Sequence, residues 1–141
     1  MEAILTPVWR TVAARTWWPR IRYLVDTSVW VNHLRSADSL LSSRLDRDEV
    51  LGHAWVTGEL ALGSLKDRQG FLTLLAQLPQ VAEVPSSRVH ELTEEHHWFS
   101  RGIGWVDAQL LAACLSWPCR LWTHDKKLAE LASELGVGAG A

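Results

Sequence analysis

The stretch IRYLVDTSVWVNHLR, residues 21–35, decides the fold, because a strand pattern changes to a helix pattern at a single aspartate. Ile21 to Val25 is a continuous β-prone run, too short for a helix and without the alternation of a strand that has one wet face. We therefore predict a central strand that is covered on both faces. Apolar residues then recur at helical spacing from Ser28 to Arg35. Asp26 thus joins a buried strand to a helix.

The alternation of strand and helix patterns continues along the chain. Short β-prone runs occur at residues 50–54 (VLGHA), 81–84 (VAEV) and 120–124 (RLWTH). Helical patterns occur at residues 39–47, 57–65, 69–78, 87–99, 105–117 and 126–135. This order predicts an α/β domain with a central, mostly parallel sheet of four to five strands and helices on both faces. In such sheets, ligands bind beyond the carboxyl ends of the strands.

The composition is that of an ordinary globular domain. Of 141 residues, 48% are hydrophobic and 21% are charged, which argues against a disordered chain, a collagen or a coiled coil. No apolar run approaches the roughly 20 residues that span a bilayer, so we expect a soluble, cytoplasmic protein without membrane contact. Cys114 and Cys119 lack the spacing of a disulfide framework or a zinc site, so we expect reduced, buried thiols on a helix and near a strand start.

The first 20 residues differ from the predicted domain at residues 21–141. They combine Trp9, Trp17 and Trp18 with several arginines and almost no acid, and two prolines interrupt them. They also lack the apolar block of a secretory signal. We expect a loosely ordered extension, or a start-site artefact, outside the fold. Contact with RNA is the alternative, because tryptophan and arginine suit base stacking and phosphate binding.

Four acids are expected at the edge of the sheet where ligands bind. Asp26 and Asp125 each follow a predicted strand. Glu59 lies near the start of the helix after the second strand, and Asp107 lies in the first turn of its helix. Apolar neighbours that should face the core would carry the last two acids toward this edge: Leu60, Leu62, Leu65, Leu110, Leu111 and Cys114.

Clustered carboxylates repel one another, so something must offset their charge. At 4 Å, one such pair costs about 4 kcal/mol at an effective dielectric constant near 20. A lysine, a shared proton or a divalent cation could each compensate. An all-oxygen ligand set suits Mg²⁺ or Mn²⁺ better than zinc, and such a metal could activate water and stabilise charge on a phosphoryl group.

Each acid taken alone also has a purely structural explanation. Asp26 and Asp125 precede helices and could be N-caps. Asp107 and Glu59 could be first-turn acids that the helix dipole favours. Both explanations stay open for each residue, whereas four acids at one edge together favour a functional site.

The stretches YLVDTSVWVNHLR, TGELALGSL, GWVDAQLLAACL and RLWTHDKKLAEL resemble the PIN-domain ribonucleases, and specifically the VapC-type toxins of type II toxin–antitoxin pairs. The resemblance covers residues 21–137, and residues 1–20 depart from the family pattern. It implies an acidic quartet at Asp26, Glu59, Asp107 and Asp125 that holds Mg²⁺ or Mn²⁺, whose bound water attacks an RNA phosphodiester. Asp26 and Asp107 would be direct ligands, while Glu59 and Asp125 would complete or orient the coordination.

The resemblance also implies supporting residues and partners. Thr123 would hydrogen-bond a carboxylate or a bound water, and Thr27 or Ser28 could do similar work, although Ser28 could equally cap a helix. The implied partners are a second copy of the chain in a homodimer and a cognate antitoxin whose tail lies across the acidic site. Some apolar helical residues could line the antitoxin groove or belong to the core: Val29, Trp30, Leu34, Leu62 and Leu65.

Basic residues near the site are candidates for binding RNA phosphates: Lys126, Lys127, Arg35 and Arg101. For the two lysines, plain solvation of a helix start is an equal explanation. The alternative function is a non-catalytic PIN-like module that binds RNA or a protein. The four intact acids count against it, because a binding module gains nothing from their mutual repulsion.

Overall fold

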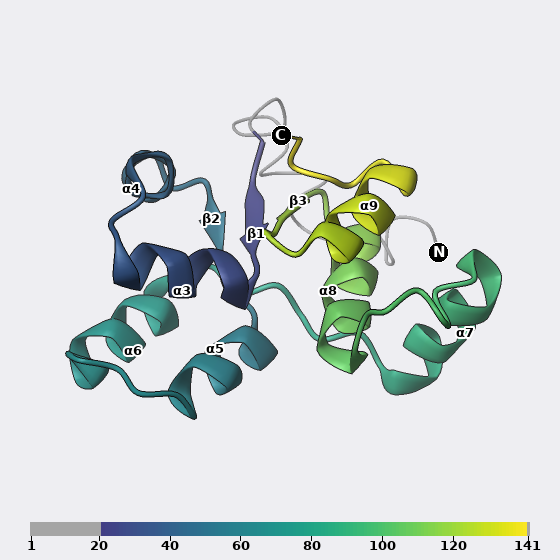
Figure 1. Cartoon of the computed structure of the whole chain (residues 1–141), viewed down its shortest axis with the longest axis horizontal. Coiled ribbons are helices and arrows are strands. Elements are labelled where there is room, and N and C mark those ends of the chain that lie inside the picture. The colour runs from purple at the N-terminus through teal and green to yellow at the C-terminus, as the bar shows by residue number, and fades with distance from the viewer. Residues whose placement is uncertain (1–20, 141) are drawn as a thin grey trace, which may run out of the picture.

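The computed structural model describes residues 21–140 (Figure 1). The predicted extension at residues 1–20 lies outside the described residues. Three parallel strands form one sheet in the order β2-β1-β3, where β1 is Tyr23–Val25, β2 is Val50–Leu51 and β3 is Arg120–Trp122. Leu24 pairs with Leu51 on one side and with Leu121 on the other. The strand before Asp26 is therefore the central one, as predicted.

Seven helices lie within residues 21–140, and each overlaps a predicted one. They are α3 (Thr27–Arg35), α4 (Ser39–Asp46), α5 (Ala54–Ala61), α6 (Arg68–Gln77), α7 (Ser86–His96), α8 (Trp105–Ser116) and α9 (Lys126–Glu134). In Figure 1, α3 to α6 lie on one side of β1 and α7 to α9 on the other. The α/β class and the parallel sheet are confirmed.

The predicted number of strands is too high for residues 21–140. Residues 81–84 form no strand, and the ladder beside β2 is limited to one bridge between Gly52 and Gln80. Beyond Val81 the backbone turns to other partners, because the carbonyl of Val84 accepts a hydrogen bond from Gln109 Nε2 at 3.3 Å. Pro85 follows and has no N–H to donate to a neighbouring strand.

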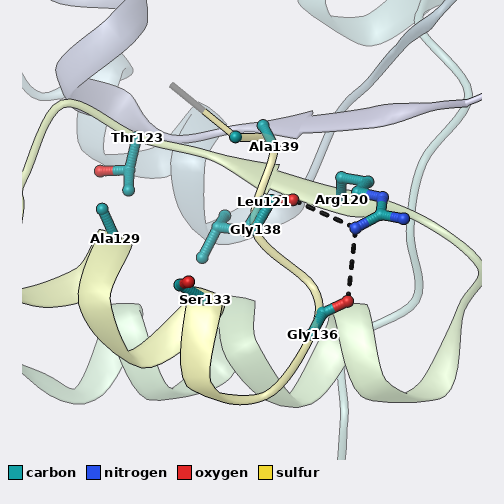
Figure 2. A pocket seen from close by; sticks show the side chains of 9 residues that line it. Arg120, Leu121, Thr123, Ala129, Ser133, Gly136, Gly138 and Ala139 are labelled. Atoms are coloured by element: carbon teal, nitrogen blue, oxygen red, sulfur yellow. Dashed lines mark hydrogen bonds between the residues drawn. The ribbon is translucent and has the colours of Figure 1, made fainter.

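Residues 136–140 run beside β3 and close the other edge of the sheet (Figure 2). The backbone of Leu121 donates to Val137 O at 2.7 Å and accepts from the N–H of Ala139 at 3.0 Å. The Arg120 guanidinium bonds two further carbonyls of this segment. Between β3, α9 and the segment lies a pocket of about 360 Å³ that reaches Thr123.

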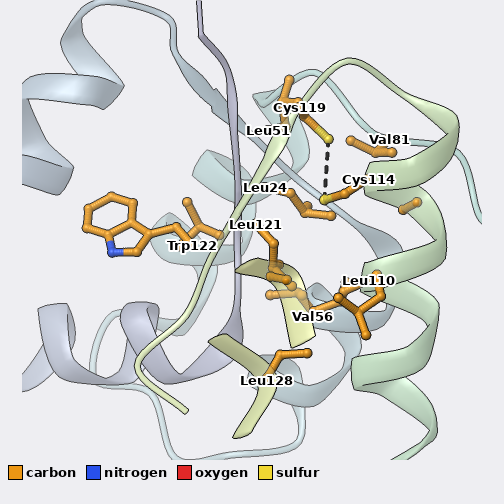
Figure 3. Close-up of a cluster of buried hydrophobic side chains, with 14 of the residues drawn as sticks. Leu24, Leu51, Val56, Val81, Leu110, Cys114, Cys119, Leu121, Trp122 and Leu128 are labelled. Carbon is orange, nitrogen blue, oxygen red and sulfur yellow. Dashed lines mark hydrogen bonds between the residues drawn. The ribbon is translucent and has the colours of Figure 1, made fainter. Parts of the chain in front are cut away.

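Both faces of the sheet are covered, which accounts for the uninterrupted apolar run of β1. Figure 3 shows Leu121 pointing toward α8 and Trp122 pointing the opposite way. On the Trp122 side, the Arg44 guanidinium of α4 lies 3.7 Å from the ring centroid of Tyr23 and 4.6 Å from that of Trp122. Leu24 is fully buried. An aromatic cluster under a cation thus packs one face, and α8 packs the other.

The helix α8 is buried at every position from Ala108 to Cys114, so it forms the central wall of the core. Cys114 lies in this helix, and Cys119 comes directly before β3. Both thiols are free and buried, as predicted, with their sulfur atoms 3.5 Å apart (Figure 3). Within the described range, none of the helices is long and apolar enough to cross a bilayer.

Candidate functional site

Asp26 lies at the carboxyl end of β1 and is 6% exposed. Its N–H donates to Trp122 O at 2.9 Å, which continues the β1–β3 ladder by one residue. Although Asp26 precedes α3, its side chain makes no capping hydrogen bond, so the N-cap explanation is wrong for this residue. Its Oδ2 atom instead accepts hydrogen bonds of 2.7 Å from Ser28 Oγ and from Thr123 Oγ1.

The two hydroxyls on Asp26 are themselves fixed by backbone groups. Ser28 Oγ accepts from the N–H of His124 at 3.0 Å, and Thr123 Oγ1 accepts from the N–H of Asp125 at 3.0 Å. Each hydroxyl therefore directs its single proton at the carboxylate. Within residues 21–140, every hydrogen bond to this side chain ends on Oδ2, which leaves Oδ1 available to a ligand.

Glu59 is brought to Asp26 by the neighbouring hydroxyl. Thr27 Oγ1 donates to Glu59 Oε1 at 2.6 Å, which joins α3 to α5. The prediction that Glu59 lies near a helix start is wrong, because α5 begins at Ala54 and Glu59 is its sixth residue. The helix begins early because His53 Nδ1 accepts the N–H of Trp55 at 3.1 Å. The helix-dipole explanation for Glu59 therefore fails.

Asp107 is the third residue of α8, and its Oδ2 atom accepts the N–H of Gly104 at 3.1 Å. Burial raises the pKa of Asp107 above its ordinary value, and the Gly104 hydrogen bond opposes the shift. The negative charges of Asp26, Asp125 and Glu59 raise this pKa further. The other three predicted acids therefore all act on Asp107.

Asp125 does cap a helix, because its Oδ1 atom accepts the N–H of Leu128 at 3.0 Å at the start of α9. The structural explanation holds for this acid, which nevertheless contributes to the field at Asp107. Among the residues that the structure describes, no three His, Cys, Asp or Glu side chains lie close enough to hold a metal as they stand. The acids are close enough to influence the pKa of Asp107, but they do not form a complete set of metal ligands as they stand.

The donor set fits a hard divalent cation. All four side chains offer carboxylate oxygens. Within residues 21–140, the hydrogen bonds to Asp26 leave its Oδ1 atom free, and the ionised form of the half-buried Asp107 is disfavoured by burial and by the three neighbouring acids. Oxygen-only ligands suit Mg²⁺ or Mn²⁺ and disfavour zinc. A cation between these carboxylates would also remove the repulsion that raises the pKa of Asp107.

The predicted RNA-binding cations divide into two groups. Lys126 and Arg35 are exposed. Arg101 is engaged, because its Nη2 atom lies 2.5 Å from Glu134 Oε2 on α9, and this pair raises the pKa of Arg101 and lowers that of Glu134. Lys127 lies against Gly102, where an added Cβ would be 2.7 Å from the lysine Nζ. Arg101 and Lys127 thus hold the loop before α8 onto α9.

A pocket beside Glu59 was not among the features predicted from the sequence. It measures about 700 Å³ and is lined by side chains from α5, α6 and the start of α8, together with Glu83. Leu62, which we expected in the core, is 92% exposed here. The available signal was the spacing of Trp55 and Glu59, because residues four apart share one helix face.

Comparisons with known proteins agree with this geometry. Residues 23–134 match the PIN domain family. Over 115 residues the chain is 47% identical to ribonuclease VapC32 from two strains of Mycobacterium tuberculosis, CDC 1551 and H37Rv, covering 81% of this chain and 93% of that protein. The crystal structure of PAE2754 from Pyrobaculum aerophilum shares the fold, with a TM-score of 0.54 and 19% identity over 79% of this chain and 84% of that one. The chain therefore belongs to the PIN domain family and, within it, to the VapC ribonucleases.

Proposed function

We propose that this protein is a metal-dependent endoribonuclease that acts as the toxin of a toxin–antitoxin pair in the cytoplasm. One observation carries the proposal: the charges of Asp26, Glu59 and Asp125 all act on the half-buried Asp107. A bound divalent cation would offset this repulsion at the edge of the parallel sheet. The 47% identity to a ribonuclease gives the corresponding reaction class.

In this proposal Asp26 and Asp107 hold Mg²⁺ or Mn²⁺, and Glu59 and Asp125 complete or orient the site. When bound, such an ion activates water for attack on a phosphodiester and offsets the charge that develops on it. Ser28 and Thr123 hold Asp26 through Oδ2, so Oδ1 would be the atom that contacts the ion.

Other residues of the chain position the acids and the RNA. Thr27 positions Glu59, because its Oγ1 atom donates a hydrogen bond to one carboxylate oxygen of Glu59. Lys126 and Arg35, both exposed, contact RNA phosphates in this proposal. Lys127 would do so while resting on Gly102. We assign Arg101 to holding its loop, because Glu134 already occupies its guanidinium.

The first test is cleavage of a labelled total-RNA pool by purified protein with Mg²⁺ or Mn²⁺. We expect discrete fragments that vanish with EDTA and with Asp26→Asn, a change that keeps the shape of the side chain. Asp46→Asn is the matched control, because Asp46 is an exposed acid at the end of α4. Circular dichroism should show that both variants are folded.

The same experiment separates the enzyme from a PIN-like binding module. Intact RNA after incubation with folded, metal-loaded, antitoxin-free wild-type protein would favour the module. Cleavage that persists in Asp26→Asn would contradict the assignment of the site. Calorimetric titration with Mn²⁺ adds a reading independent of the substrate, since a module without the metal would release no heat.

We also propose a cognate antitoxin and a homodimer as partners. Of the candidate groove residues, Val29 and Trp30 belong to the core, whereas Leu34 is 47% exposed. Leu34 and Leu74 line an apolar pocket of about 350 Å³ between α3 and α6. Sedimentation should give twice the chain mass of 15.9 kDa. Co-expressed antitoxin should relieve growth arrest by the wild type, and Leu34→Glu should weaken that relief.

A further inference from the structure

The pocket beside Glu59 is largely apolar, and metal binding by the four acids does not account for it. The indole of Trp55 is 36% exposed on it, and Leu62 is 92% exposed. Its volume of about 700 Å³ lies within the range of ligand-binding pockets, and clustered exposed apolar side chains mark binding surfaces. Its remaining lining includes Glu59, Arg68, Glu83 and Val106.

Trp55 is anchored through its indole nitrogen and through its backbone. Its Nε1 atom donates a hydrogen bond to Glu83 Oε1. Its backbone N–H donates to Nδ1 of His53, which is 1% exposed and caps α5. A ring that is already fixed loses little conformational freedom when a ligand covers it. The pocket therefore offers a flat, preorganised aromatic surface.

The pocket is continuous with the acid site along two elements. Glu59 lines the pocket and accepts the hydroxyl of Thr27, the residue next to Asp26. Val106 lines it from the first turn of α8 and directly precedes Asp107. A group seated against Trp55 would thus be linked by a short chain to whatever reacts at the carboxylates.

The charges around the pocket select a neutral ligand. Two carboxylates, Glu59 and Glu83, face a single cation, Arg68. The Nη1 atom of Arg68 donates to the carbonyl of Ala61 and so is partly satisfied within the protein. A phosphate would be repelled, whereas an uncharged planar group can stack on the indole and offer its edge donors to carboxylate oxygens.

We propose that this pocket receives one unpaired nucleobase of the RNA substrate, stacked on Trp55, and so determines which nucleotide lies beside the scissile phosphate. The inference rests on the proposed ribonuclease function and adds to it a base-binding subsite. Stacking on aromatic side chains is one way in which proteins hold single-stranded RNA. Because Glu59 lines the pocket and Val106 precedes Asp107, a base in the pocket would lie beside the acid site.

The test is a cycle that combines protein variants with abasic substrates. An oligonucleotide spanning a mapped cleavage site is made intact and with a single abasic position on each side of the scissile bond. We expect Trp55→Ala to lower kcat/KM about tenfold to a hundredfold on the intact substrate, and Trp55→Phe to keep most of it. One abasic position should cause the same loss in the wild type and no further loss in Trp55→Ala.

Two additional variants protect the test against misfolding and general surface effects. A Cβ on Gly58 would meet no atom within 4 Å, so Gly58→Phe adds a ring to the pocket side of α5 with the Trp55 indole intact. It should reproduce the loss seen with Trp55→Ala. Phe99→Ala removes an aromatic ring that is 52% exposed in the loop before α8, outside the pocket. It should leave kcat/KM unchanged.

Binding gives a reading that does not need cleavage. In an Asp26→Asn background, the affinity for a fluorescent single-stranded RNA of mixed sequence, chosen without reference to a cleavage site, should fall by a similar factor when Trp55→Ala is added. Absence of cleavage by the wild type would defeat the ribonuclease function while this binding cycle still measures the subsite. Unchanged RNA affinity and cleavage in Trp55→Ala would overturn the inference, and a simultaneous loss of antitoxin affinity would assign the pocket to that protein partner.

Discussion

Thr123 Oγ1 lies 2.7 Å from Asp26 Oδ2 and 3.0 Å from the backbone nitrogen of Asp125. One hydroxyl thus joins the carboxyl ends of β1 and β3 and connects two of the four acids. It donates to the first acid and accepts from the second, so its orientation is fully determined. The acid site therefore depends on a residue that carries no charge.

Replacement of Thr123 by valine should separate positioning from metal binding. Thr123→Val keeps the shape and removes the hydroxyl, and loss of a hydrogen bond to a charged group costs about 1.5–3 kcal/mol. We expect kcat to fall about tenfold or more while KM changes little, and Thr123→Ser to restore most of it. Thr93→Val is the control, because the Thr93 hydroxyl bonds Val89 O within α7. A wild-type rate in Thr123→Val would contradict the positioning role.

Asp107→Asn should stabilise the metal-free protein while abolishing cleavage. Burial and three neighbouring carboxylates raise the pKa of Asp107, so its ionised form is disfavoured in the folded state. The folded protein loses stability when the pH rises through this pKa and Asp107 ionises. Asparagine carries no charge, so Asp107→Asn avoids this loss. Thermal melts in EDTA at pH 7 should show a higher Tm for Asp107→Asn than for the wild type.

Divalent metal should make the wild type melt at a higher temperature than Asp107→Asn, the reverse of the order expected in EDTA. A ligand that binds only the folded state at one hundred times its dissociation constant adds about 2.7 kcal/mol, so Mg²⁺ should raise the wild-type Tm by several degrees. Asp107→Asn should respond far less. An equal response of both proteins to Mg²⁺ would exclude Asp107 as a metal ligand.

Acid should destabilise the protein through His53. Burial lowers the pKa of His53 below its ordinary value, and the charge of Glu83 opposes this only in part. The folded state therefore binds a proton less readily than the unfolded chain does. The stability that neutral His53 contributes is fully present above about pH 6.5, the ordinary pKa of histidine, and is lost as the pH falls through the lower pKa of the folded state. Melting curves between pH 7.5 and 5 should show this loss.

His53→Asn is the control for the acid effect, because asparagine can still cap α5 but does not titrate. Its Tm should decline less than that of the wild type over the same range. Parallel declines would show that another group causes the acid sensitivity.

Gly102→Ala should loosen the loop before α8. Gly102 has a φ of +81°, and an added Cβ would lie 2.6 Å from Lys127 Cδ. We expect a loss of about 1 kcal/mol in the free energy of unfolding. Gly58→Ala in the interior of α5 is the opposite control, because it meets no neighbour and should stabilise slightly. Urea denaturation of both variants measures the contrast.

The buried thiols should react slowly in the native protein. The hydrogen bond shared with Cys119, together with burial, raises the pKa of Cys114 well above its ordinary value, and the thiolate is the reactive form. Under native conditions a thiol reagent should label the pair only at the rate of unfolding. In denaturant both cysteines should react at once, and rapid native labelling would contradict the packing of α8 on β3.

Sequence patterns predicted the elements of this fold well because hydrophobic spacing is a local property. The run from Ile21 to Val25 predicted a strand buried on both faces. Pro118, which follows α8, predicted where that helix ends. Strand number was less predictable, because pairing depends on distant partners. Residues 81–84 have the composition of a strand, yet Gln109 takes the Val84 carbonyl from a different part of the chain.

The positions of Asp26 and Asp125 were predictable because each follows a strand. The hydroxyl groups that hydrogen-bond the acids were harder to predict. A threonine that ends a strand predicts little by itself, and the bond between Thr123 and Asp26 exists only after β1 and β3 pair. The exposure of Leu62 could not be foreseen, because α5 ends at Ala61 and leaves Leu62 at its C-cap instead of inside the predicted helix.

The hydrogen bond between Asp26 and Thr123 spans 97 residues of chain, and this separation affects how the protein is made. A ribosome synthesises β1 first, and Thr123 at the end of β3 follows Asp26 by 97 residues. Until β3 emerges, Asp26 lacks the backbone partner and the hydroxyl that fix it, and Asp125 does not yet exist. The growing polypeptide therefore cannot assemble its carboxylates before β3 has been synthesised. The complete acid site forms only when two strands far apart in the sequence have paired.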